Sequence, residues 1–443
     1  MPPPPFLSSG RSLSGWCHFR EFVALLCRRG FLDEYLSVPE DGGRQVKTVA
    51  IRVGVDVGSK SHQVGIAGSD GQLLEEFQIS HSEAGFQEFF DRIEEHRRGN
   101  GFSVSVAMEG YNGHSRPLDR HVLEQGYELY SVNNLKLARF REIFPGAAKT
   151  DRLDTRKILE LFHLKEHLPL AKDVLQRVVQ IPAVNARLKR VSRRRRQLVN
   201  EKVRVVNRLQ SDLQGVCPDL LGLTHDAGNL WFLRFLSCRD DLRQLSRIRM
   251  ESVLKISGIG KKYAGLIRAW QRTAKFSDEV DYVGSMIISD ARRILELIDQ
   301  ISSLESILEE LCVESQMAEL LSAIPGYGLV TVSELTGEIG SADRFRSESS
   351  LALYLGMSPL DKSSGQSRGT RSPRQVNRRA KAAMMTAVAR HIGQVPESAS
   401  YYQKKREEGK KHNQAVRSLG RHMVRVIWSM LIQNRDYEQR AIK

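Results

Sequence analysis

Cysteine is scarce in this chain of 443 residues, and its five cysteines lie far apart in the sequence. They are Cys17, Cys27, Cys217, Cys238 and Cys312. Their odd number and the lack of a Cys-x-x-Cys pair argue against a disulfide framework and against a zinc site. Long apolar runs are missing too: none reaches the ~18 residues of a membrane span, and the short one at 22–27 is no secretory signal. These absences predict a protein of the reducing cytoplasm that has no membrane partner.

Acidic residues are fewer than basic ones, with 52 Asp and Glu against 67 Lys and Arg, which leaves a net charge of +15. Residues 361–443 hold 19 Lys and Arg but only 6 Asp and Glu, so nearly the whole excess lies in the last fifth. Such a balance favours a polyanionic partner, nucleic acid above all, over an acidic small molecule. The length predicts two or three units, each large enough to bury its own core.

Residues 1–46 begin Met-Pro-Pro-Pro-Pro and are rich in Ser, Gly and Arg, which predicts a disordered extension or a start of translation assigned too far upstream. Organised sequence begins at 47. Val53, Val55 and Val57 then alternate with small or polar residues, which predicts a strand that carries Asp56. Strands at 63–67 and 73–79 would complete an antiparallel meander.

Helices and strands alternate after this meander. We expect a helix at 82–97, a strand at 103–108 that ends at Glu109, a helix at 117–124 and a strand at 128–132. A basic helical piece at 135–143 and a helix that opens at Asp151 follow. This layout is typical of an α/β domain of the RuvC or ribonuclease-H type.

Four carboxylates fall where such a fold brings its strands and a late helix to one edge of the sheet: Asp56, Glu109, Asp151 and Asp154. Alone, each has an ordinary explanation as a solvated residue or, for the last two, as a favourable charge at a helix start. Together they repel one another unless cations neutralise them. Carboxylate oxygens suit Mg²⁺ or Mn²⁺, and two such ions can stabilise a phosphodiester displacement. The four acids therefore predict a metal site.

The middle of the chain is predicted to be helical. A basic helix at 187–213 contains Arg193, Arg194, Arg195 and Arg196, and a second helix keeps heptad spacing from Ile294 to Leu311. We expect them to form the arms of an antiparallel hairpin or a dimerising coiled-coil stalk. The four arginines are either a solvated helix face or a contact to nucleic-acid phosphates, and the overall charge favours the second.

Two short glycine motifs resemble helix-hairpin-helix turns, in which glycines let backbone N–H groups approach a DNA phosphate. The first, at 256–260, is at least as well explained as a structural turn between helices. The second contains Gly326 and Gly328 and precedes a longer string, with Glu338-Ile339-Gly340, Tyr354-Leu355-Gly356 and Ser363-Ser364-Gly365. We predict that Gly326 and Gly328 bind nucleic acid.

Over residues 47–440 the sequence resembles the DEDD-type insertion-sequence transposases, bridge-RNA-guided serine recombinases with a RuvC-like amino-terminal half, to which the Piv invertases are related. The markers are the strand with Asp56, the Glu109-Gly110-Tyr111 run, the Lys149-Thr150-Asp151-Arg152-Leu153-Asp154 block, the basic helix and the string from Pro325 to Gly365.

The resemblance implies a recombinase that excises a mobile element and inserts it at a DNA target chosen by a structured guide RNA. It also implies a homo-oligomer, a dimer or a tetramer in the synapse, that acts at the bacterial nucleoid. The four acids would bind metal, and Ser364 would attack the DNA phosphate to form a phosphoserine. By local sequence Ser364 is an ordinary polar-loop residue, and Ser363 is the second candidate for the nucleophile.

One segment departs from the family, which has an Ile-Ser-Lys-x-Gly-Asn-like run shortly after the serine where this chain reads Arg371-Ser372-Pro373-Arg374-Gln375-Val376-Asn377. The glycine is missing, although Arg374, Arg378 and Arg379 would still contact phosphates. The resulting architecture has a catalytic domain at 47–178, a helical region at 179–315 and a mainly α transposase domain at 316–443. The alternatives are a metal-dependent junction endonuclease without a covalent intermediate and an inactive nucleic-acid-binding scaffold.

Overall fold

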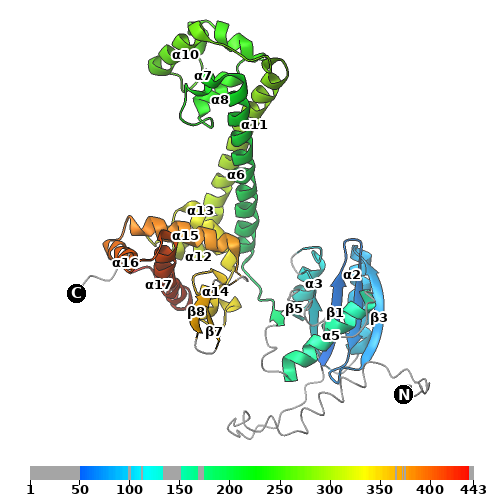
Figure 1. Ribbon diagram of the computed structural model, residues 1–443. Coiled ribbons are helices and arrows are strands. Elements are labelled where there is room, and N and C mark those ends of the chain that lie inside the picture. Colours follow the sequence, from blue (N-terminus) through cyan, green and yellow to red (C-terminus); the bar gives the residue numbers. More distant parts are fainter. Residues whose placement is uncertain are drawn as a thin grey trace, which may run out of the picture. The chain divides into compact units, whose positions relative to one another are not determined.

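The computed structural model describes residues 50–97, 101–110, 113–132, 151–167, 174–364, 367–371, 373 and 376–438. The predictions for residues 1–46 and for a helical piece at 135–143 lie outside these ranges. The chain divides into two compact units, Met1–Gln176 and Arg177–Lys443, which are coloured from blue to cyan-green and from green to red in Figure 1.

A six-stranded sheet forms the centre of the first unit. Its strands are β1 (Ala50–Val57), β2 (Ser61–Ala67), β3 (Leu73–Ser80), β4 (Ser103–Met108), β5 (Glu128–Val132) and β6 (Leu175–Arg177). Their order is β3-β2-β1-β4-β5-β6. Antiparallel pairing joins β1 to β2 and β2 to β3, while β4 runs parallel to both β1 and β5. The predicted meander followed by parallel strands is confirmed, and the mixed sheet is consistent with a ribonuclease-H-like fold.

Helices cover both faces of this sheet: α2 (Glu83–Arg97), α3 (Leu118–Glu124) and α5 (Asp151–His167). His62 of β2 is fully buried, and its ring stacks on Phe86 of α2. Gly65 lies three residues after His62 on the same strand, so it faces the other side of the sheet, where it meets α5. The alternation that predicted the strands therefore also separates the α2 face from the α5 face.

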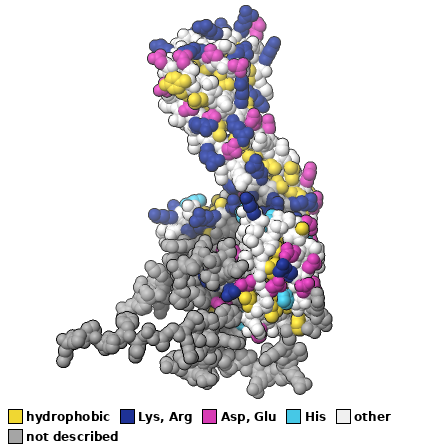
Figure 2. All heavy atoms as spheres, turned by 90° about the vertical axis from the view of Figure 1, so that its right-hand side faces the viewer, with side chains coloured by type: hydrophobic (Ala, Val, Ile, Leu, Met, Phe, Trp, Pro, Cys, Tyr) yellow, Lys and Arg dark blue, Asp and Glu magenta, His cyan; other side chains and the backbone are white. Residues whose placement is uncertain are grey.

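Two long antiparallel helices, α6 (Ala183–Val216) and α11 (Val280–Val313), lie side by side in the second unit (Figure 1). Ion pairs cross between them along their length, from Arg187 with Glu314 at one end to Arg293 with Glu201 farther along. The two predicted helices are present, and within one chain they pair as an antiparallel hairpin. Lys and Arg alternate with Asp and Glu over this part of the surface (Figure 2).

Short helices between α6 and α11 close one end of the hairpin and pack around one apolar core. They are α7 (Pro218–Leu221), α8 (Leu230–Leu236), η3 (Leu242–Arg247), α9 (Met250–Leu254) and α10 (Lys261–Thr273). Phe232 and Phe235 of α8 are fully buried there, with Trp270 of α10 beside them. The first glycine motif forms the α9–α10 turn, in which Gly258 has a φ of 93° and lies against Trp231.

A second apolar core lies at the opposite end of the hairpin, where α6 begins and α11 ends. Its elements are α12 (Gln316–Ser322), α13 (Leu329–Ile339), η4 (Ala342–Arg344), α14 (Glu348–Tyr354), β7 (Leu360–Ser364), β8 (Ser367–Arg371), α15 (Arg378–Ile392), α16 (Pro396–Glu407) and α17 (His412–Gln433). Side chains such as Leu335, Met384 and Val424 are fully buried in it. The second unit is thus mostly helical, as predicted. Among the helices described, none is long and apolar enough to cross a membrane.

Candidate active site

Two glycines allow α5 to pack closely on the sheet. Gly54 of β1 and Gly65 of β2 are opposite each other in the strand register. A Cβ atom at Gly54 would lie 3.0 Å from the carbonyl oxygen of Thr155, and one at Gly65 would lie 2.9 Å from the Thr155 Cγ2 atom. The backbone of α5 at Thr155 therefore runs directly over this strand pair, which fixes the height of Asp154 above the sheet.

Asp56 and Glu109 occupy neighbouring positions at the end of this same sheet. Val55 pairs with Met108 in parallel register, and the Glu109 N–H donates to the Val55 carbonyl oxygen at 3.2 Å. The next residue of β1, Asp56, is thus beside Glu109. Side chains two positions apart along a strand share a face, so Asp56 lies on the Gly54 face, which α5 covers.

Glu109 belongs to the same face by the same alternation. It follows Ala107 by two residues, and Ala107 packs in a core cluster with Ile158 and Phe162 of α5. Asp154 of α5 is only 4% exposed, and its Oδ1 lies 3.6 Å from the Lys157 Nζ. The fold therefore brings three of the four predicted acids to the α5 face. Two of them, Asp56 and Glu109, lie at the carboxyl ends of the neighbouring strands β1 and β4.

The donor set fits Mg²⁺ or Mn²⁺ in chemistry, because all of its members are carboxylates. Asp151 is the first residue of α5, but its side chain lies outside the described part of the structure. Among the described side chains, no group of three or more His, Cys, Asp or Glu residues is arranged to hold a metal ion. Metal binding by Asp56, Glu109, Asp151 and Asp154 stays a prediction.

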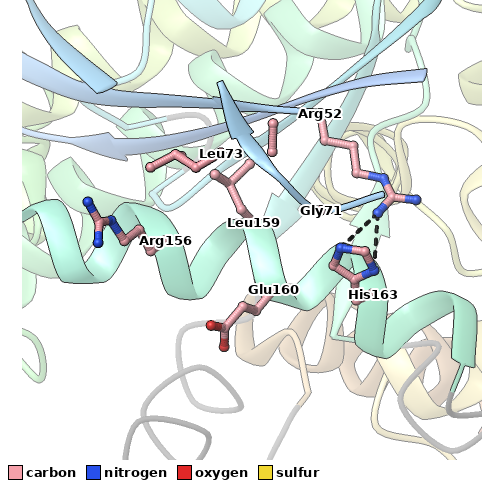
Figure 3. Close-up of a pocket in the computed structure, with 8 residues that line it drawn as sticks. Arg52, Gly71, Leu73, Arg156, Leu159, Glu160 and His163 are labelled. Carbon is pink, nitrogen blue, oxygen red and sulfur yellow. Dashed lines mark hydrogen bonds between the residues drawn. The ribbon is translucent and has the colours of Figure 1, made fainter. Parts of the chain in front are cut away.

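Farther along α5 the same face forms a small pocket (Figure 3). Arg52 of β1 is 5% exposed, and its Nη1 lies 3.4 Å from both ring nitrogens of His163. Arg156 donates to both carboxylate oxygens of Glu76, at 2.6 and 2.7 Å. Sequence reasoning missed Arg52, although a charged residue in the buried alternation of β1 is a signal that could have found it.

Glu160 is an acid of α5 whose pKa is strongly shifted. Figure 3 shows its carboxylate directed away from Arg52 and His163, and its buried Oε2 has no hydrogen-bond partner among the described residues. Burial raises the pKa of Glu160 to about 7, while Lys157 acts to lower it. The group is therefore protonated at mildly acidic pH and charged above neutrality.

We expect Glu160→Gln to remove a pH dependence of stability. A pKa raised by folding stabilises the native state fully below the unfolded value of 4.5, and that contribution is lost as pH rises through about 7. The loss at pH 8 is on the order of 2 kcal/mol after allowance for solvent. Urea unfolding at pH 5 and pH 8 should show the variant gaining stability over the parent only at pH 8. Equal effects at both pH values would contradict this account.

Ser364 ends β7, and it pairs with Ser367 of β8 across a tight hairpin, while Ser363 pairs with Arg368. The predicted nucleophile thus stands beside the turn of a two-stranded hairpin. The side chains of both serines lie outside the described part of the structure. Their backbone positions belong to the second unit, whereas the four acids belong to the first.

Three of the four consecutive arginines of α6 have carboxylate partners inside the second unit. Arg193 donates to both oxygens of Glu338, at 2.6 and 2.9 Å. Arg196 does the same with Glu334, at 3.0 and 2.8 Å, and Arg195 pairs with a glutamate of α11. These side chains hold α6 against α13 and α11. Nucleic-acid binding by the run stays a prediction, with Arg194 as its exposed member.

Gly326 lies where α12 turns into α13, with a φ of 86°. A Cβ atom there would come within 2.5 Å of the His391 backbone nitrogen on α15. Close approach to α15 therefore explains this glycine without any phosphate. Gly328 is exposed and caps α13, so it remains available for the predicted contact to nucleic acid.

Gly326→Ala should destabilise the second unit by roughly 2–4 kcal/mol, because it combines an unfavourable φ with a clash against backbone. Gly328→Ala, at a negative φ and with only the Arg390 side chain near, should cost under about 1 kcal/mol. Thermal unfolding of the two variants measures the difference. A stable Gly326→Ala protein that had lost only DNA binding would instead support the phosphate contact.

Two family models match the chain: one described as "Transposase" over residues 53–218, and one described as "Transposase IS116/IS110/IS902 family" over residues 318–403. The chain belongs to the IS116/IS110/IS902 family of transposases. The sequence-based resemblance to insertion-sequence transposases is confirmed, and with it a DNA transposase or recombinase as the class of enzyme.

Named relatives agree with this transposase assignment. The chain is 26% identical to the "Insertion element IS116 uncharacterized 44.8 kDa protein" of Streptomyces clavuligerus over 87% of its own length and 95% of the relative. It is 24% identical to the "Mini-circle putative transposase for IS117" of Streptomyces coelicolor, over 84% and 91%. The "Pilin gene-inverting protein" of Moraxella bovis is 29% identical over 33% of this chain and 46% of that protein.

A buried polar network explains part of the string that marked the transposase in sequence. Glu338 is 1% exposed and accepts from Asn377 Nδ2 at 2.7 Å as well as from Arg193. Asn377 also donates to the Tyr354 hydroxyl, which donates to the Glu338 carbonyl oxygen. Neighbouring Arg193 and the hydrogen bonds hold the pKa of Glu338 below its usual value against the opposing effect of burial.

This network positions the start of α15 in the transposase. The Asn377 side chain accepts from the backbone N–H groups of Arg379 and Ala380, so it caps the helix as well as binding Glu338. Arg378 and Arg379 are exposed in the first turn, as a contact to phosphates requires, whereas Arg374 lies outside the described residues. Sequence reasoning named Asn377 only as part of a run and missed its role.

Proposed function

We propose that this transposase cuts and rejoins DNA strands through a phosphoserine at Ser364, assisted by a carboxylate site of Asp56, Glu109, Asp151 and Asp154. The observation that carries the proposal is the convergence of Asp56, Glu109 and Asp154 on the face of the sheet that α5 covers. Family membership makes DNA the substrate. Because the serine and the acids belong to different compact units, the reaction needs both units.

The chemistry follows from the groups named. The Ser364 Oγ would form a bond to phosphorus while the bond from phosphorus to one deoxyribose oxygen breaks. The serine proton leaves to a base, and the departing deoxyribose oxygen takes up a proton. The four acids would hold Mg²⁺ or Mn²⁺, which when bound neutralises charge on the phosphate oxygens. Rejoining reverses these bond changes with a different deoxyribose hydroxyl as the attacking group.

A structured guide RNA and a homo-oligomer complete the proposal. Both rest on the resemblance to bridge-RNA-guided recombinases, and the net charge of +15 supports a polyanionic partner. A dimer, or a tetramer in the synapse, would supply more than one serine for the four strands of an exchange. Sequencing the RNA that co-purifies with the protein tests the guide: one discrete species supports it, and random cellular RNA contradicts it.

The deciding experiment is a search for a covalent protein–DNA product. End-labelled DNA carrying an element end is incubated with the full chain, the RNA that co-purifies with it and Mg²⁺, then denatured and separated by size. Label that stays with the protein and is released by protease supports the phosphoserine. Metal-dependent cleavage without such label would favour the junction endonuclease, and the absence of any cleavage would favour the inactive scaffold.

A further inference from the structure

A basic groove of about 500 Å³ in the second unit has no part in the function proposed so far. It lies between the segment that precedes β7 and the helices α16 and α17. The residues used below are Ser358, Pro359, Lys410, Arg417, Arg421 and Arg425, all of which line it. We call this surface the basic groove.

The cations of the groove form one stripe. Arg417, Arg421 and Arg425 are four residues apart along α17, so they share one face of the helix, and Lys410 adds a fourth positive charge. No carboxylate is among the described residues that line the groove. From outside the groove, Glu348 binds Arg421, and the Glu408 Oε2 lies 3.1 Å from the Lys410 Nζ.

Such a stripe works against the stability of the helix, because like charges at i and i+4 repel. Burial lowers the pKa of Arg421, and neighbouring Arg425 lowers it further. Burial, and then neighbouring Arg425, also lower the pKa of His422, which lines the groove. The apolar face of α17, with Leu419 and Val424, already secures the helix to the core. Apart from Arg421, which pairs with Glu348 of α14, the stripe is therefore not needed to hold α17 in place.

The walls of the groove are fixed by close packing. Gly420 lets α17 press against the segment before β7, because a Cβ atom at this position would lie 2.5 Å from the Met357 Sδ atom. Met357 is 2% exposed, and it stands directly before Ser358 and Pro359. The groove is thus formed without any partner, which favours a preformed binding surface.

We propose that the basic groove binds the sugar-phosphate backbone of DNA next to the point of strand cleavage. Pro359 directly precedes β7, and Ser364 ends it, five residues away. At about 3.3 Å per residue these positions are roughly 17 Å apart. That distance corresponds to about five base pairs of duplex, whose backbones present a negative charge every ~1.7 Å along the axis. The placement beside cleavage rests on the proposed role of Ser364, whereas DNA binding by the groove does not.

The test is salt-dependent DNA binding by Arg417→Gln/Arg425→Gln, made in the full chain, with Lys202→Gln/Arg204→Gln on α6 as the control of equal charge. Two lost phosphate contacts should lower the slope of log K against log salt concentration by about 1.8 and the affinity on the order of tenfold at 0.15 M salt. In the control variant, the slope and the affinity should change much less. The groove variant should keep or slightly raise its melting temperature, because it loses two repulsive pairs, Arg417 with Arg421 and Arg421 with Arg425.

Each other outcome overturns the proposal. Equal losses in both variants would mean that only overall charge matters. An unchanged DNA slope with weaker binding of a structured RNA would assign the groove to RNA. A lower melting temperature with unchanged affinity would make the stripe structural. Binding measured in a Ser364→Ala background separates this result from the proposed chemistry, since loss of the covalent product leaves groove binding intact.

Discussion

Ser364→Ala is expected to abolish the covalent protein–DNA product and to lower strand transfer by on the order of 10³-fold or more. Removal of a nucleophile leaves no atom that can form the bond to phosphorus, so the covalent route closes completely. Ser364 is the last residue of a hairpin strand, and the change to alanine removes a single oxygen atom, so the variant should fold normally. Denaturing electrophoresis of labelled DNA measures the product, and thermal unfolding checks the fold.

Ser363→Ala is the matched control for this change. It alters the preceding residue of β7, which pairs with Arg368 in the same hairpin. The control should retain the covalent product within a few-fold of the parent. If Ser363→Ala lost the product and Ser364→Ala kept it, the nucleophile would be Ser363. Full cleavage by both variants and by the double variant would leave the metal-dependent endonuclease as the better description.

The amino-terminal unit was the easier one to predict, because its signals are local. Alternating valines around Asp56 predict β1, and the turn residues that follow predict the meander. The closeness of α5 to the sheet was not predicted. It depends on Gly54 and Gly65 being opposite each other in the register, and a register is set by contacts far apart in sequence.

The second unit was harder to predict, because its important contacts join residues that are far apart in the sequence. The run from Arg193 to Arg196 was interpreted from its charge alone, but the carboxylates that bind Arg193 and Arg196 are 145 and 138 residues away. No local pattern reveals such pairs. No local pattern singles out the stripe of Arg417, Arg421 and Arg425 either, because the groove needs Met357 and Ser358 from another segment.

Asp56→Asn and Asp154→Asn are each expected to lower metal-dependent cleavage by on the order of 10³-fold. Neutral amide oxygens are weaker ligands for a hard cation than carboxylates, and the site would lose charge as well as geometry. A second readout does not depend on activity. Ions that bind only the native state raise its stability in proportion to the logarithm of their concentration. The parent should therefore melt at higher temperature as Mg²⁺ is added, whereas the variants should respond much less.

Asp70→Asn serves as the control, because Asp70 is an exposed acid in the same unit whose side chain accepts from the Gln72 backbone in a turn. It should cleave DNA and respond to Mg²⁺ like the parent. A parent that gained no stability from Mg²⁺ or Mn²⁺ would contradict the metal site. Normal cleavage by Asp56→Asn would leave the convergence of these acids on the α5 face without a catalytic meaning.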